Sequence, residues 1–316
     1  MLAVKATGLE QAVDDMAAAV GPHSLVVPVL NGVRHVDVLA ARFGDQAVLG
    51  GVSKVATTLD AQGDIVRLAP LQDLRYGARR NTAPARLDEV HRVLSGAGFT
   101  TGLSDDIVAE MWAKWVFIAA LGAVTCLMRG SVGEVAAVPG GTAFARQVVD
   151  ECASVATAAG YPVPAPALQQ TLATVTEAGS PLTSSLYRDV TGNRSAETEH
   201  IYGDLVLRAH RLGLTVPLLD LVTMHLRLHQ NRIEGARLTG QYTLGECFRN
   251  PWSGPPRCGD PAGGRGHGGS GRRVSGTRSA APPGRTMGKT GLYVKFRAQQ
   301  SSATPWPRSC SKPRSS

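Results

Sequence analysis

The sequence predicts an α/β fold: a parallel sheet with covering helices in the first third of the chain, then an all-α region and a disordered tail. Three observations support this prediction. Short apolar segments alternate with amphipathic ones up to about residue 104, helical periodicity dominates from 105 to about 232, and Gly, Pro, Ser and Arg dominate from about 238. We therefore expect three parts, at residues 1–104, 105–237 and 238–316.

The first part alternates strands with helices. The segments "LAVKA" (2–6) and "SLVVPVLNG" (24–32) are apolar runs typical of buried strands. Apolar residues at helical spacing fill residues 8–22, which end in Gly-Pro, and residues 33–44, which end in Gly. The order strand, helix, strand, helix indicates parallel strands covered by helices.

The rest of the first part adds two strands, a helix and a final strand. Residues 47–59 and 64–71 are strand-like and flank "DAQG", which is a turn signal. An amphipathic helix is predicted at 84–98 and a short strand at 99–104. We expect these elements to complete the sheet.

The second part is helical throughout. Helical spacing recurs in segments that begin or end at Gly or Pro, namely 141–160, 164–179, 196–213 and 217–233. An apolar run at 105–130, "DDIVAEMWAKWVFIAALGAVTCLMRG", precedes them. This run is close to the length of a membrane span, but a helix buried in a protein core is the better interpretation.

The basic charge of the chain belongs to its tail. The net charge is +8, yet residues 241–316 hold 13 Lys and Arg against 2 Asp and Glu, whereas the other 240 residues hold 20 against 23. The tail has too few apolar residues to offset its ordering entropy, so we expect it to be disordered. Its arginines lack interleaved aromatic residues and a folded platform, so no specific nucleic-acid partner is expected.

The cysteines and the first residues indicate a reducing compartment. Five scattered cysteines form no close pairs, and the first residues lack a charged segment followed by an apolar stretch. We expect a cytoplasmic protein without a membrane partner.

Lys114 is the only charged residue between Met111 and Met128. The ordinary interpretation is that its stem lies on apolar surface and its ammonium reaches water. The functional interpretation is an amine held in a dry cleft, where burial lowers its pKa and makes its proton easier to donate. The helix alone leaves both interpretations open.

The metal-ligand and nucleotide motifs of the chain are weak. Gly264, Gly266 and Gly269 match the dinucleotide fingerprint, but no strand or helix is predicted beside them. His225 and His229 have the spacing of zinc ligands on a helix, without a catalytic Glu or a third ligand. A single Glu-x-x-His beginning at Glu197 lacks the second copy of a di-iron site. We predict no metal.

Several segments, in order and at the right spacing, resemble the ketopantoate reductases (2-dehydropantoate 2-reductases). The resemblance runs from residue 2 to about residue 230. It rests on "AVKA", "VLNG", "GGVSKVA", "DDIVAEMWAK" and "SSLYRD", with a Glu following the last segment. No single segment is decisive, but together they cover both predicted folded parts. The resemblance implies a partial Rossmann-like sheet, a helical second domain and reduction of a 2-keto acid by NADPH.

The resemblance also assigns roles to residues. It implies that Lys114 is the catalytic residue, which as an ammonium stabilises the developing oxyanion and donates the proton. It implies cofactor contacts for Lys5, Asn31, Ala56 and Glu197, and substrate contacts for Asn31 and Ser185. Glu197 could also pair with Lys114. A small keto acid is the expected partner, and a homodimer is possible in principle.

The sequence departs from the family at several positions. The family usually has Asn where this chain has Ile118, Gly122 and Leu182, so we expect a more apolar site and a substrate that need not be ketopantoate. The family also begins with a βαβ unit that bears GxGxxG, which is missing before "AVKA". Two other readings therefore stay open: a catalytically inactive fragment, and a non-enzymatic helical module that dimerises through its exposed half-sheet.

Overall fold

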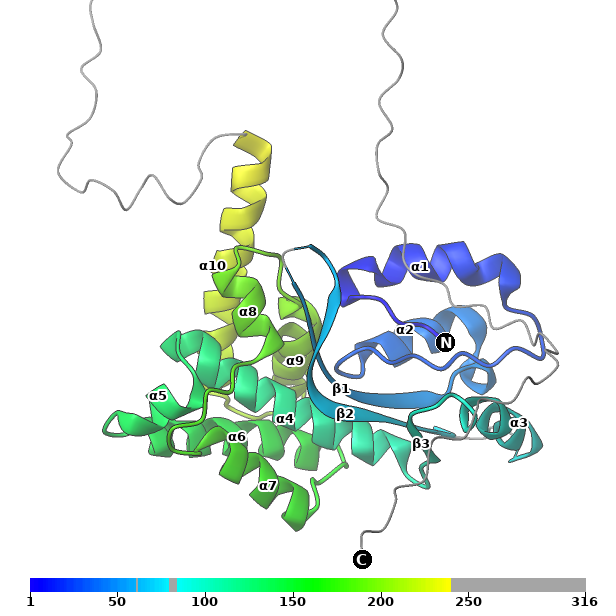
Figure 1. Cartoon of the computed structure of the whole chain (residues 1–316), viewed down its shortest axis with the longest axis horizontal. Helices are drawn as coiled ribbons and strands as arrows, with labels where there is room; N and C mark the ends of the chain where they lie inside the picture. The colour runs from blue at the N-terminus through cyan, green and yellow to red at the C-terminus, as the bar shows by residue number, and fades with distance from the viewer. Residues whose placement is uncertain (61, 80–83, 240–316) are drawn as a thin grey trace, which may run out of the picture.

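A computed structural model describes residues 1–60, 62–79 and 84–239 of the chain (Figure 1). The tail predicted at 238–316, with the glycine motif at 264–269, lies outside these residues except for its first two positions. The described chain has an N-terminal region with a small sheet and a helical region beside it (Figure 1). The predicted fold class is confirmed, whereas the predicted domain boundaries stay a prediction.

The described residues of the N-terminal region form three helices, three strands and three short 3-10 turns. The helices are α1 (Leu9–Met16), α2 (Arg34–Phe43) and α3 (Pro84–Leu94). The strands are β1 (Gly50–Leu59), β2 (Ile65–Gly77) and β3 (Thr100–Leu103). The 3-10 turns are η1 (Ala6–Gly8), η2 (Ala17–Ala19) and η3 (Asp45–Ala47).

The three strands form a mixed sheet rather than a purely parallel one. In the order β1-β2-β3, β1 pairs with β2 antiparallel and β2 pairs with β3 parallel. The antiparallel pair is the hairpin that the turn signal indicated. The first eight residues of β2 are exposed, so the hairpin is buried only at its base, where Leu74 and Tyr76 lie in the core.

The predicted strands at 2–6 and 24–32 do not form ladders. One isolated parallel bridge, Leu2 with Pro28, joins the two segments, and a second, Val26 with Val48, joins segment 24–32 to the chain before β1. The direction agrees with the predicted parallel pairing, but its extent was overestimated. Pro28 has no N–H group, so it cannot donate to a longer ladder.

The helical region extends from Ile107 to Thr239. Its elements are α4 (Ile107–Met128), α5 (Val132–Ala137), α6 (Gly141–Ala158), α7 (Ala165–Val175), α8 (Ser185–Thr191), the π-helical turn η4 (Glu199–Gly203), α9 (Asp204–Arg211) and α10 (Pro217–Thr239). The other helices of this region pack around α4, which lies at its centre (Figure 1).

Helix α4 has the composition of a membrane span and the burial of a core helix. Its mean hydropathy is 1.7 over the most apolar window, and 67% of that window is buried inside the protein. It is the one helix of the described residues that is long and apolar enough to cross a membrane. Asp106 caps its first turn by accepting a hydrogen bond from the Ala109 N–H, and Arg129 ends it in the left-handed conformation.

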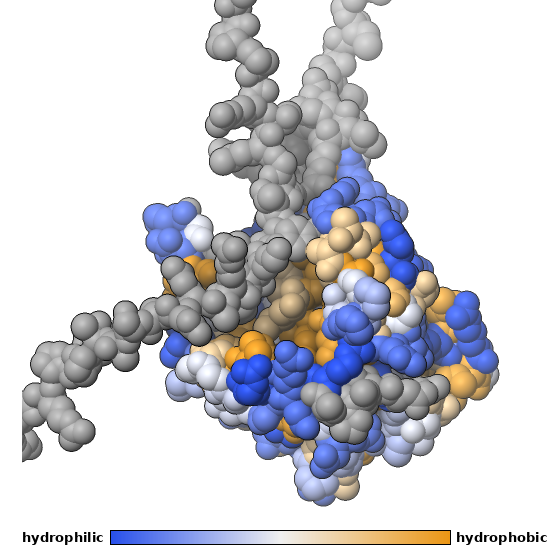
Figure 2. Space-filling model, turned by 90° about the vertical axis from the view of Figure 1, so that its right-hand side faces the viewer, coloured by the Kyte–Doolittle hydropathy of each residue, from blue (hydrophilic) through white to orange (hydrophobic). Residues whose placement is uncertain are grey.

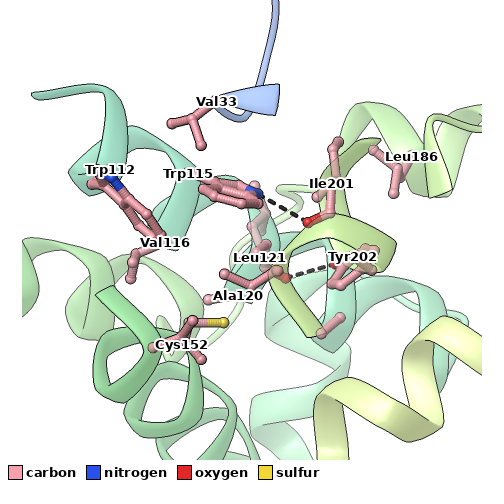
Figure 3. Close-up of a cluster of buried hydrophobic side chains, with 14 of the residues drawn as sticks. Val33, Trp112, Trp115, Val116, Ala120, Leu121, Cys152, Leu186, Ile201 and Tyr202 are labelled. Carbon is pink, nitrogen blue, oxygen red and sulfur yellow. Dashed lines mark hydrogen bonds between the residues drawn. The ribbon is translucent and has the colours of Figure 1, made fainter. Parts of the chain in front are cut away.

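One continuous hydrophobic core joins the N-terminal region to α4. Figure 3 shows Val33, which precedes α2, above Trp115 of α4. The Trp115 indole Nε1–H donates to the Ile201 carbonyl at 2.9 Å, and the Tyr202 hydroxyl donates to the Ala119 carbonyl at 2.6 Å (Figure 3). These two bonds satisfy the only polar atoms of two large buried side chains, and they fix η4 against α4.

Candidate active site

Lys114 lies in the third turn of α4, next to the fully buried Trp115. Its side chain is half-buried and forms no hydrogen bond or ion pair with the described residues. Burial and, to a smaller extent, repulsion by Lys54 lower the pKa of Lys114, the negative charge of Glu197 opposes them, and the net pKa is about 8. Lys114 is therefore an amine that both holds and releases a proton near neutral pH.

Glu197 lies within the electrostatic reach of Lys114, although no direct ion pair joins these two residues. It lies two residues before the π-helical turn η4. Its Oε1 accepts a hydrogen bond from the Ala6 N–H at 2.7 Å, at the start of η1. The structure therefore brings Glu197 to both the N-terminal segment and the Lys114 environment.

Lys5 connects the N-terminal region to α8. Its ammonium lies 2.9 Å from Oδ2 of Asp189, and its side chain is 59% exposed. The other carboxylate oxygen of Asp189 accepts from Nε of Arg194 at 3.0 Å. An exposed pair of this kind contributes about 0–1 kcal/mol to stability, so Lys5 is free to exchange Asp189 for another anion.

Asn31 lies on a turn that contacts two buried histidines. Burial lowers the pKa of both His35 and His200, and the nearby Asn31 backbone opposes this shift at each ring. Gly32 has φ +71°, and a Cβ on it would lie 3.0 Å from the His200 carbonyl oxygen, so a glycine fits here best. The turn is therefore held against η4 through its backbone, and the half-buried Asn31 side chain forms no hydrogen bond with the described residues.

Ala56 and Ser185 occupy less constrained positions. The register between β1 and β2 shifts at Ala56, where four residues of β2 lie opposite this single residue. Ser185 is the exposed first residue of α8. Its neighbour Ser184 is the cap of that helix, is buried, and shares a 2.8 Å hydrogen bond with the Thr125 hydroxyl. Ser184 is therefore structural, whereas Ser185 is accessible.

A groove of about 460 Å³ opens beside Glu197. It is lined by the N-terminal segment, the start of α2, the segment from Ser195 to His200, and α10. Thr198 lines this groove, and its buried hydroxyl has no hydrogen-bond partner among the described residues. Glu197 Oε2 fits a hydroxyl of a nicotinamide ribose, and exposed Lys5 fits a phosphate. The described residues therefore fit the nicotinamide end of a dinucleotide.

The three departures from the family pattern have a structural counterpart. Lys114, Ile118 and Gly122 lie one turn apart on the same face of α4. A Cβ on Gly122 would clash with the Tyr202 hydroxyl oxygen, so Tyr202 fills the space of any side chain there. Leu182 packs against the core, and Ile118 does the same. This face is apolar, as the sequence predicted.

The contact between His35 and His200 was not predicted from the sequence. Nδ1 of His35 lies 3.3 Å from Nε2 of His200, and the two rings stack 5.5 Å apart. These residues are 165 positions apart, and a single histidine in an amphipathic helix carries no signal of its own. Gly32 is the local signal that could have indicated a close approach here, because it has a positive φ and lies against the His200 carbonyl oxygen.

The metal motifs form no site among the described residues. No group of three or more His, Cys, Asp or Glu side chains that could hold a metal ion occurs there. His225 and His229 are half-buried on α10, and Nε2 of His229 lies 3.0 Å from the Arg194 carbonyl oxygen. His200 contacts His35 instead of a metal-binding carboxylate.

Comparison with known families covers both regions of the chain. Residues 1–81 match "Ketopantoate reductase PanE/ApbA", and residues 106–230 match "Ketopantoate reductase PanE/ApbA C terminal". The chain belongs to the ketopantoate reductase family. This family consists of oxidoreductases, and the predicted resemblance is confirmed.

Individual relatives and structures agree with this assignment. The chain is 28% identical over 230 residues to the uncharacterised oxidoreductase YkpB of Bacillus subtilis, covering 73% of this chain and 76% of that protein. It resembles D-mandelate dehydrogenase with NADH and anilino(oxo)acetate, with a TM-score of 0.65 at 18% identity over 74% and 76% of the two chains. A dimeric ketopantoate reductase from Staphylococcus aureus has a TM-score of 0.64 at 19% identity over 73% and 77%. At these identities the structures show a shared fold.

Proposed function

We propose that the chain is a reductase of a small 2-keto acid that uses NADPH, with Lys114 as its proton donor. The observation that carries this proposal is the state of Lys114: a half-buried amine with a pKa of about 8, within the electrostatic reach of Glu197. A general acid works best when its pKa is near the working pH. The likeness to a dehydrogenase structure with NADH supports the choice of a nicotinamide cofactor.

The residues of the chain divide the work in this proposal. A bound nicotinamide cofactor supplies the hydride. Lys114 stabilises the negative charge that develops on the keto oxygen and then protonates it. Asn31 and Ser185 orient the substrate by hydrogen bonds, while Lys5, Glu197 and the strand at Ala56 hold the cofactor. The cofactor roles of Lys5, Glu197 and Ala56 rest on the family resemblance together with the positions of these residues in the structure.

The apolar face of α4 supports a substrate with an apolar side chain. Ile118 and the filled space at Gly122 offer no hydrogen bond beyond the lysine. We therefore propose a 2-keto acid whose side chain is apolar, with ketopantoate as one substrate to be compared. A substrate that needs a hydrogen bond from the site is turned over poorly when the site lacks the matching polar group. Comparing ketopantoate with a more apolar 2-keto acid is therefore informative.

Titration with NADPH and with NADH tests the proposal directly. We expect saturable binding, seen as a change in nicotinamide fluorescence, and weaker binding after Glu197→Gln. The matched control is Glu177→Gln, which changes an exposed carboxylate away from the groove. Absence of binding at millimolar concentrations of both cofactors would reject the reductase.

One observation favours a non-enzymatic dimerisation module instead. Helix α10 exposes Leu221, Met224 and Leu228 along one face, which is a spacing that fits a helical partner. Sedimentation of the wild type and of Met224→Glu tests self-association. A dimer that the substitution breaks, in a chain that binds no cofactor, would support the module; a dimer in a chain that binds cofactor is compatible with both.

A further inference from the structure

We propose that the Lys54 ammonium binds the carboxylate of the 2-keto acid, because β1 places Lys54 on the sheet face that packs against α4, at the level of Lys114. This inference rests on the proposed function and deepens it. Lys114 acts on the keto oxygen of the substrate, and the carboxylate next to that oxygen needs a cation of its own. Lys54 supplies this cation.

One face of the three-stranded sheet packs against α3. Leu49 and Tyr76 form a hydrophobic cluster with Leu87 of α3 that is separate from the main core. Successive side chains of a strand point to opposite faces, so Gly50, which follows Leu49, faces away from α3. The pairing of β1 with β2 is regular from Gly50 to Val55, so this alternation continues along that stretch.

The opposite face of the sheet packs against α4 (Figure 1). A Cβ on Gly50 would meet the side chains of Ile107 and Met111 in the first turns of α4. Val52 is buried in the hydrophobic core that contains both of these α4 residues. Lys54 is the next residue of β1 on this face, so its side chain also starts on the α4 side of the sheet.

The strand and the helix advance together, which brings Lys54 to the level of Lys114. Arg75 is the partner of Val52 across the sheet, and its Nε lies 3.7 Å from Oε2 of Glu110. From Val52 to Lys54 the strand rises about 6.7 Å. From Glu110 to Lys114 the helix rises about 6 Å and completes one turn, so these two residues lie on the same side of α4. Lys54 and Lys114 therefore occupy corresponding positions along the packed strand and helix.

The charges of these residues agree with this placement. Burial is the largest cause of the lowered pKa of Lys114, and repulsion by Lys54 is the second. Such repulsion is screened beyond roughly 10 Å. Asp73 is the partner of Lys54 across the sheet, yet Lys54 forms no hydrogen bond or ion pair with any residue in the described part of the chain. The Lys54 ammonium is therefore free to bind an anion.

A 2-keto acid carries its two oxygen groups on adjacent carbons, and the two lysines match them. The half-buried Lys114 reaches the keto oxygen, where its proton is needed. The exposed Lys54 lies nearer to solvent, where an ammonium binds a carboxylate through its charge and up to three N–H donors. An anion between two ammonium groups also relieves their mutual repulsion. The pair therefore selects anionic 2-keto acids over uncharged carbonyl compounds.

Substrate selectivity tests this role of Lys54. The comparison uses 2-keto-3-methylbutanoate and its uncharged amide, because both have the same keto group and the same apolar side chain. Lys54→Met keeps an unbranched side chain and removes the charge. We expect the ratio of kcat/KM for the acid to kcat/KM for the amide to fall at least tenfold, mainly through a higher KM for the acid, since a charge-assisted hydrogen bond is lost.

Two further variants separate the charge of Lys54 from its packing. Lys54→Arg keeps the charge and should retain most of the preference for the acid. Arg92→Met removes an exposed cation from α3, on the other side of the sheet, and should leave the ratio unchanged. The proposal is overturned by an unchanged ratio in Lys54→Met that is folded by circular dichroism. It is also overturned by an equal fall in Arg92→Met, which would indicate an effect of overall charge.

Binding of oxamate, an anion with the shape of a small 2-keto acid, gives a readout that needs no turnover. Titration calorimetry with and without NADP⁺ should show binding to the wild type, at least fivefold weaker binding to Lys54→Met, and much weaker binding of the uncharged ethyl ester. If the wild type reduces neither substrate but its oxamate affinity depends on Lys54, the reductase fails and the anion site stands. If the wild type is active and Lys54→Met changes neither selectivity nor oxamate affinity, the reductase stands and the role of Lys54 fails. An inactive wild type that binds no oxamate would overturn both.

Discussion

The helical region and the N-terminal region hold their site residues in different ways. Lys114 projects from a 22-residue helix whose next residue, Trp115, is fully buried and hydrogen-bonded. Lys5 and Asn31 lie on connecting segments that two isolated bridges and a backbone contact hold in place. Seen from the N-terminal side, hydrophilic surface surrounds small hydrophobic patches (Figure 2).

This difference separates chemistry from binding. A long core helix fixes the position of an amine to within its rotamers, and the same packing removes water that would otherwise keep its pKa high. Segments between elements adapt to a ligand more readily, because fewer buried contacts hold them. We therefore expect substitutions on α4 to affect kcat or folding, and substitutions in the N-terminal segments to affect binding.

The largest expected effect comes from Lys114→Ala. Removing the proton donor should lower kcat at least about 1000-fold while cofactor binding changes little, because general-acid and oxyanion terms both disappear. The measurement is steady-state turnover with NADPH and a 2-keto acid, with fluorescence titration beside it. If turnover survived the substitution, the proton donor would have to lie in the N-terminal region. The proposed division between chemistry on α4 and binding in the N-terminal segments would then be wrong.

Trp115→Phe tests how rigidly the helical region is built. The change leaves the Ile201 carbonyl without its donor and opens a small cavity, so unfolding free energy should fall by about 2–3 kcal/mol in urea titration. Tyr187→Phe is the control, since it removes a hydroxyl that donates to the Arg129 carbonyl at an exposed site. Equal losses in the two variants would argue against a special rigidity at Lys114.

The pH dependence of kcat locates the donor. The pKa of Lys114 is about 8 in the folded chain, against 10.5 ordinarily, so kcat should fall about tenfold per pH unit above 8 as the donor loses its proton. The free energy of unfolding should instead rise with pH between 8 and 10.5, because the unfolded chain binds more protons than the folded chain in that window.

Lys114→Arg is the control for this pH profile. Arginine stays charged throughout the accessible range, so any remaining activity should show no fall near pH 8. An unchanged fall in that variant would mean that another group sets the profile.

The smallest effect is expected from Lys5→Ala. The exposed pair with Asp189 stabilises the fold by less than about 1 kcal/mol, so the melting temperature should hardly change, whereas KM for the cofactor should rise a few-fold. Arg194→Ala removes the other partner of Asp189 and should leave KM unchanged. If Lys5→Ala lowered the unfolding free energy more than Trp115→Phe does, the N-terminal region would be the more rigidly held of the two.

Most helices could be predicted from the sequence because their ends carry chemical signals. Helix α6 ends at Ala158, just before Gly160, and α7 follows Pro164 at the start predicted from that residue. The charge of Lys114 in an apolar run also marked it in advance. These features are local, so one sequence is enough to detect them.

Long-range features could not be predicted in the same way. The segments 2–6 and 24–32 have the composition of strands, yet Pro28 limits them to isolated bridges. The pairing of His35 with His200 depends on how α2 docks on η4, and no periodicity encodes that contact. The reach of Glu197 to the Ala6 N–H is likewise a product of tertiary packing.

The contact between Gly122 and Tyr202 means that these two positions cannot be altered one at a time. Any side chain introduced at 122 meets the phenol ring of 202, and a smaller residue at 202 leaves an empty space beside 122 together with a carbonyl deprived of its donor. A library that seeks activity on new substrates should therefore randomise both positions together, because a substitution at either position alone disturbs its contact with the other.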